Sequence, residues 1–122
     1  MSKIARGTSE DVDKAVKAAQ ESEWRKYTAL KRSRALLNMA QIVLEEVNIL
    51  AELEANDVGK PLKQAKADAV ALARYLEFYS GAADKIHGET IPYLDGYTVY
   101  TLREPHGVTG HIIPWNLSLI HI

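Results

Sequence analysis

The chain has 122 residues, of which 47% are hydrophobic and 25% charged, as in an ordinary globular domain. Its net charge of -1 argues against a nucleic-acid or anionic-membrane surface, because such surfaces usually carry a basic patch. With no cysteine, these residues hold no disulfide, no thiolate metal site and no cysteine nucleophile. We expect a cytoplasmic protein without a membrane span, because no apolar run approaches about 18 residues.

The N-terminal half predicts helices. Thr8 can cap a first helix, with Asp11 reaching back to it as a capping-box variant, and this helix should end near 21–23. A second helix should run from Thr28 to about Asn56, since apolar residues recur at helical spacing along it.

The sequence 56–61 (Asn-Asp-Val-Gly-Lys-Pro) should stop that second helix. Gly59 can take a left-handed conformation there, and Pro61 can begin a third helix that extends to about Ile86. The chain then changes period. Residues 97–103 are rich in β-branched and aromatic side chains and predict a strand. Residues 104–107 predict a turn, and Val108–Ile113 predict a second strand that enters a buried sheet.

Most candidate chemical groups favour ordinary structural roles. The four histidines lack metal-ligand spacing, so no metal site is predicted. Glu45, Glu46, Glu52 and Glu54 lie on the second helix and are interpreted as a solvated face. Neither a nucleophile elbow nor a glycine-rich phosphate loop occurs. Asn116 could donate its side-chain amide to an oxyanion, but spacing alone favours a turn or capping asparagine.

Four stretches, taken in order, resemble the N-terminal part of the NAD(P)-dependent aldehyde dehydrogenase superfamily, and the resemblance extends over nearly the whole chain, from about Thr8 to Asn116. They are Asn56–Pro61, Tyr79–Lys85, His87–Pro92, and Arg103–Gly110 followed by Ile112–Asn116.

The resemblance implies an α/β parent fold with a Rossmann-like cofactor domain, of which this part is mainly α-helical with a β-hairpin and a first sheet strand. Residues 1–94 would be the helical part of the cofactor-binding domain. Residues 95–107 would be a β-hairpin arm whose strand 97–103 joins copies into a homo-oligomer. Residues 108–116 would hold the first strand of the sheet, and 117–122 an atypical tail.

The resemblance also implies a site. Ile113, Pro114 and Trp115 would lie beside NAD or NADP, and Asn116 would donate to the oxyanion formed from an aldehyde substrate. The family's catalytic cysteine and glutamate have no counterpart here, so this N-terminal fragment is predicted to be inactive alone. The alternative is a non-catalytic truncated protein that binds full-length subunits or perturbs their assembly.

Overall fold

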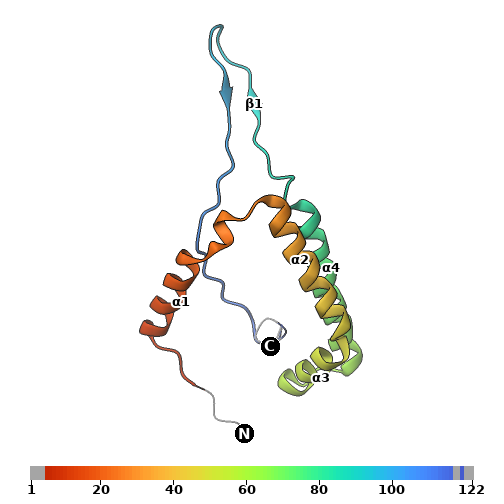
Figure 1. Cartoon of the computed structure of the whole chain (residues 1–122). Helices are drawn as coiled ribbons and strands as arrows, with labels where there is room; N and C mark the ends of the chain where they lie inside the picture. Colours follow the sequence, from red (N-terminus) through yellow and green to blue (C-terminus); the bar gives the residue numbers. More distant parts are fainter. Residues whose placement is uncertain (1–4, 117–118, 120–122) are drawn as a thin grey trace.

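The computed structural model describes residues 5–116 and Leu119, where helices come first and strands last, as predicted (Figure 1). In chain order the elements are α1 (Ser9–Glu21), the 3₁₀ helix η1 (Glu23–Lys26), α2 (Ala29–Glu45), α3 (Val47–Val58), α4 (Leu62–Ala82), β1 (Thr90–Ile91) and β2 (Val99–Tyr100). Among the described residues, no helix is both long and apolar enough to cross a bilayer. The predicted tail 117–122 lies outside the described residues, apart from Leu119.

The start of α1 confirms the predicted cap. The Asp11 main-chain N–H donates to the Thr8 hydroxyl at 3.4 Å, and the Thr8 main-chain N–H donates to the Asp11 carboxylate at 2.9 Å. This reciprocal pair satisfies two donors that a helix start otherwise leaves open. No residue of α1 is buried, and the helix stands apart from α2, α3 and α4 (Figure 1).

The second predicted helix is in fact two helices. α2 and α3 are separated at Glu46, whose φ of -99° and ψ of 11° leave the helical region, and α3 then runs in a different direction (Figure 1). The prediction of one helix to Asn56 was wrong because the apolar spacing continues across the break and neither glycine nor proline marks it. The hydrogen bonds on both sides, from Glu46 N–H to Ile42 O and from Leu50 N–H to Glu46 O, keep the helical pattern.

The packed interior lies between α2, α3 and α4 and is made of small side chains. Its wholly buried hydrophobic residues are alanines: Ala40, Ala51, Ala65, Ala69 and Ala73. Because alanine has only a methyl group, these faces allow the helices to approach closely.

Several residues of the predicted apolar faces are only half-buried, among them Leu36, Val43 and Val47, and Tyr79 is 60% exposed. Beside the alanines, the Ser33 and Ser80 hydroxyls join α2 to α4 at 3.2 Å.

The hairpin begins earlier in the chain than predicted. β1 pairs with β2 in antiparallel register, with Thr90 opposite Tyr100 and Ile91 opposite Val99. The pair projects away from the helices (Figure 1). The predicted strand 97–103 is therefore confirmed only at its centre. Its partner, β1, was missed because it is only two residues long and lies between Gly88 and Pro92, residue types that are uncommon in strands.

The predicted strand Val108–Ile113 is not formed among the described residues, and its place as the first strand of a Rossmann-like sheet stays a prediction. The described residues of this segment form no β-ladder. A strand is defined by main-chain hydrogen bonds to a neighbour, and β1 and β2 pair with each other instead. Strand propensity in Val108–Ile113 is therefore not realised.

We expect Gly88→Ala to open the base of the hairpin. A Cβ at this position would lie 1.7 Å from the main-chain oxygen of Thr101, so the backbone must shift. That shift would break the bonds from Thr101 N–H to Glu89 O and from Glu89 N–H to the Thr101 hydroxyl, both 2.9 Å. Hydrogen exchange at the Thr101 amide should accelerate about fivefold or more, which matches the ~1 kcal/mol of one hydrogen bond.

The matched control is Gly81→Ala, because an added Cβ there meets no atom within 4 Å. It should leave Thr101 exchange unchanged. Equal exchange in the Gly88→Ala variant and the unmodified chain would contradict a close approach at the hairpin base.

Candidate functional site

The turn between α3 and α4 determines where Lys60 lies. Gly59 ends α3 in the predicted left-handed conformation, with φ 74° and ψ 21°, and its N–H donates to Ala55 O at 2.9 Å. Pro61 caps α4 and accepts hydrogen bonds at its carbonyl from the N–H groups of Gln64 and Ala65. With its neighbours fixed on both sides, Lys60 occupies the corner between two packed helices.

The ammonium group of Lys60 contacts three oxygens from three different segments. Its Nζ lies 2.8 Å from Glu54 Oε1 on α3, 2.7 Å from Asp68 Oδ2 on α4, and 2.9 Å from the main-chain oxygen of Asn116. We call these four residues the Lys60 cluster. An ammonium group has three N–H donors, so the three acceptors use its full capacity.

The sequence predicted that Glu54 lies on a solvated helix face, and this prediction was wrong. Glu54 is wholly buried, and its side chain is only 1% exposed. Its position three residues after the buried Ala51 places it on the face of α3 that packs against α4. Among the described residues, its Oε2 has no hydrogen-bond partner, so Lys60 is the group that compensates the buried charge.

Asp68 completes the cluster and is held on both sides. Its Oδ2 accepts from Lys60, and its Oδ1 accepts from the Gln64 amide at 2.8 Å. The hydrogen bond from Lys60, with a smaller contribution from Gln64, lowers the pKa of Asp68 below its usual value. The hydrogen bonds to Asp68 and then Glu54 raise the pKa of Lys60.

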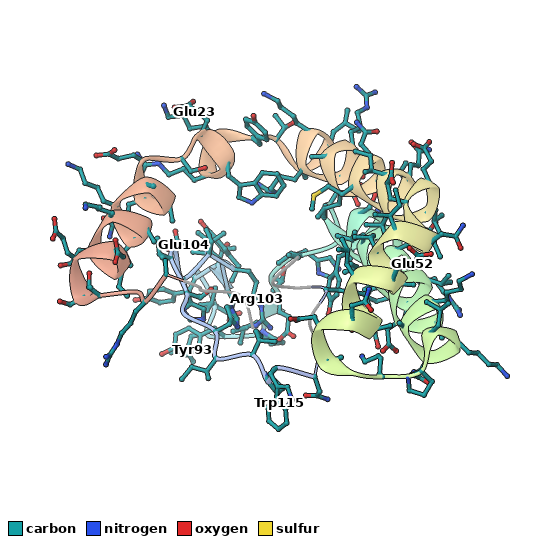
Figure 2. All side chains as sticks on the ribbon, turned by 90° about the horizontal axis from the view of Figure 1, so that it is seen from below. Glu23, Glu52, Tyr93, Arg103, Glu104 and Trp115 are labelled. Carbon is teal, nitrogen blue, oxygen red and sulfur yellow. The ribbon has the colours of Figure 1, made fainter. Side chains whose placement is uncertain are left out.

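The residues predicted for the site lie together at the end of the described chain. Ile113 is half-buried, whereas Pro114, Trp115 and Asn116 are exposed, and Trp115 and Asn116 form a turn. The indole of Trp115 is 78% exposed and points outward from the chain (Figure 2). Asn116 joins the Lys60 cluster through its main-chain oxygen, which leaves its side-chain amide as a donor for other groups.

Sequence reasoning missed the Lys60 cluster almost entirely. Lys60 was noticed only as part of a helix stop, and Asp68 was not singled out. One available signal was the spacing of Glu54 from Ala51 and Leu50, which share a helix face with it. No group of three or more potential metal ligands occurs among the residues that the structure describes.

Comparison with known proteins identifies the family. The family model described as "Aldehyde dehydrogenase family" matches residues 1–122. An aldehyde dehydrogenase of Arabidopsis thaliana, family 2 member B4, is 48% identical over 122 residues, which cover 96% of this chain and 23% of that protein. The mitochondrial aldehyde dehydrogenase of Rattus norvegicus is 44% identical, with 96% of this chain and 24% of that protein covered.

Solved structures agree with this match. An aldehyde dehydrogenase from Burkholderia cenocepacia superposes with a TM-score of 0.93 and 56% identity, covering 98% of this chain and 26% of that one. A betaine aldehyde dehydrogenase from Staphylococcus aureus, solved in complex with NAD+, superposes with a TM-score of 0.68 and 33% identity. The match covers 74% of this chain and 19% of that one.

The chain belongs to the aldehyde dehydrogenase family and spans about a quarter of the length of the relatives it matches. The predicted fold class is confirmed in its helical part and its hairpin. The Arabidopsis and rat relatives are named as mitochondrial proteins, and the cytoplasmic location expected from the sequence stays a prediction.

The Lys60–Asp68 pair gives stability a defined dependence on pH. The folded-state pKa of Asp68 lies below its ordinary value of 3.8. The carboxylate therefore adds to the free energy of unfolding above pH 3.8, and this stabilisation is lost as the pH falls through the folded-state pKa. The folded-state pKa of Lys60 lies above its ordinary 10.5, so its contribution is present below that pH and is lost as the pH rises through the raised value. The pair therefore stabilises the fold most between these limits.

We expect Asp68→Asn to make the free energy of unfolding depend less on pH in the acid range. The variant should be less stable than the unmodified chain at pH 7, and the difference should shrink as the pH falls below about 3.8, because the carboxylate advantage is then lost. Urea unfolding followed by helix circular dichroism at pH 7 and pH 3 measures both differences. Asp13→Asn, on the exposed α1, is the control. A pH-independent difference for Asp68→Asn would contradict the ion pair.

Proposed function

We propose that the chain forms the N-terminal part of an enzyme that oxidises an aldehyde to a carboxylic acid with NAD or NADP as hydride acceptor. The observation that carries this is the exposed turn with Asn116, held by Lys60 in a chain of this family. The family's nucleophilic cysteine is not among these residues, because the chain contains no cysteine. Alone, residues 1–122 are therefore expected to be inactive.

In this proposal Asn116 donates its side-chain N–H to the oxygen of the aldehyde as negative charge develops on it. A donor that is already positioned lowers the barrier because it need not reorganise during the reaction. The geometry supports this role in two ways. Asn116 is exposed, and its main-chain oxygen rather than its side-chain amide is used by Lys60.

Ile113, Pro114 and Trp115 would contact the cofactor. The exposed indole of Trp115 and its apolar neighbours would offer apolar contact to a planar nicotinamide ring, but these residues provide no cradle for phosphates. When bound, the nicotinamide accepts the hydride. The part of the cofactor-binding domain contributed here would be residues 1–94, with 108–116 leading into the site.

A chimera tests the function of Asn116 in an active context. Residues 1–116 of this chain would replace the matched segment of the Burkholderia cenocepacia aldehyde dehydrogenase, which is 56% identical. Asn116→Ala should lower kcat by about two to three powers of ten, as for other oxyanion donors. Steady-state NAD(P)H formation is the measurement. Asn48→Ala, an exposed asparagine on α3, should retain activity. Equal kcat in the two variants would refute the proposed role.

The hairpin supports a second candidate function, which is binding to full-length subunits. Within the part of the chain that the structure describes, β1 and β2 form a two-stranded sheet with no further strand at either outer edge, and Tyr97 and Tyr100 are 69% and 62% exposed. An exposed pair of this kind can add to the sheet of another subunit. The arm, including β1 and the predicted 95–107, would then assemble homo-oligomers in a full-length parent and perturb them as a separate chain.

Co-elution with the full-length Burkholderia cenocepacia enzyme on size exclusion tests the binding function. Tyr100→Pro should abolish co-elution, because proline removes a main-chain donor from β2. Tyr93→Pro is the matched control, since Tyr93 is also exposed but lies outside the ladder. Absence of co-elution for the unmodified chain would exclude this function.

A further inference from the structure

The hydrogen bond from Lys60 to Asn116 connects residues that are 56 positions apart in the sequence. Its two other bonds reach only six and eight positions along the chain, to Glu54 and Asp68. Lys60 therefore does two things with one ammonium group. It closes the corner between α3 and α4, and it attaches the segment that carries the predicted site to that corner.

The surroundings of Lys60 make it a rigid anchor. Its side chain is 15% exposed, and both carboxylates that accept its hydrogen bonds belong to helices. Glu54 is wholly buried, and the carboxylate of Asp68 is oriented by Gln64. Charge-assisted bonds of this kind are shorter and stronger than neutral ones. The bonds to Glu54 and Asp68 therefore fix the position of Nζ independently of its bond to Asn116.

The segment that Lys60 attaches has little other support among the described residues. Val108–Ile113 forms no β-ladder, Ile112 is fully exposed, and the bond between the Thr109 hydroxyl and the His111 ring is local. A hydrogen bond to the main-chain oxygen of Asn116 restrains the carbonyl group next to the Cα that carries the side-chain amide. Restraining this peptide also limits the directions that the amide can take.

We propose that Lys60, held by Glu54 and Asp68, is a positioning residue that fixes the turn of Trp115 and Asn116 against the corner of α3 and α4. The anchoring is a property of this chain, while its consequence for catalysis rests on the function proposed for Asn116. The competing explanation is that Lys60 acts only to neutralise the buried Glu54.

The chain itself provides the first test, by NMR with 13C at the Asn116 carbonyl and 15N throughout. Removing Lys60 alone leaves Glu54 buried without a partner, which strongly destabilises a fold and would confuse the readout. The main variant is therefore Glu54→Gln with Lys60→Met, which removes both charges together. Lys63→Met, an exposed lysine at the start of α4, is the matched control.

With helix content unchanged by circular dichroism, the double variant should shift the Asn116 carbonyl resonance and lower the 15N heteronuclear NOE of residues 115–116. Lys63→Met should change neither signal. Lys60→Arg, which keeps the charge and several donors, should restore part of the order. A folded double variant with unchanged Asn116 signals would overturn the proposal, because a lysine that only neutralises Glu54 would give that result.

If the double variant fails to fold, Asp68→Asn provides a milder change with the same readout. Loss of the charged acceptor should loosen the Lys60 ammonium group and produce a smaller shift in the same direction at the Asn116 carbonyl. No shift there would count against the anchor.

The chimera described above separates this inference from the proposed function. Lys60→Met with Glu54→Gln should lower kcat by about ten- to a hundredfold, the size of effect expected from a small misplacement of a catalytic group. The KM for the aldehyde should change much less, and Lys60→Arg should recover part of kcat. If Asn116→Ala lowers kcat and the double variant does not, positioning by Lys60 is refuted while the function of Asn116 stands. If Asn116→Ala has no effect, the function fails, and the NMR signals alone decide whether Lys60 anchors the turn.

Discussion

The close approach of α2, α3 and α4 is the constraint on which the rest of the structure depends. The helices meet along alanines that are completely removed from solvent. Alanine brings helix axes together but buries little apolar area per residue, so this contact fixes geometry more than it supplies hydrophobic free energy. The larger side chains consequently face outward. On α4, Tyr75, Phe78 and Tyr79 are each at least 60% exposed, and they provide apolar surface for further protein contacts.

The same packing explains why an acidic residue is buried. Glu54 shares a face of α3 with Ala51, so the packing that removes Ala51 from water removes Glu54 as well. A buried carboxylate is tolerated only with a compensating partner, and Lys60 reaches it because Gly59 and Pro61 turn the chain between the two helices. A local turn, a helix contact and an ion pair are thus consequences of one arrangement. Asn116 is attached to this helix corner because the third N–H of the Lys60 ammonium group donates to its main-chain oxygen.

Features fixed by neighbouring residues could be predicted from the sequence. The capping pair of Thr8 and Asp11 involves residues three apart, and the left-handed Gly59 follows from the helix it ends. The break at Glu46 could not be predicted, because the apolar pattern is the same whether the helix continues or bends. Glu54 was misjudged for a related reason. The side chain is acidic, and only the contact with α4 shows that its face of the helix is covered.

Val108–Ile113 and Asn116 show a different limit. A strand exists only when another strand accepts and donates its hydrogen bonds, so residue preference could not decide whether this segment forms one. For Asn116 the local pattern favoured a turn, and the structure does place it in a turn. The turn and the proposed oxyanion donor are therefore compatible, since the main chain makes the turn and the side chain remains to donate. What joins the two roles is a lysine 56 residues earlier, and no periodicity or spacing rule connects residues at that separation. The order of residues in the motifs was enough to indicate the family, whereas the support of the site had to come from the folded chain.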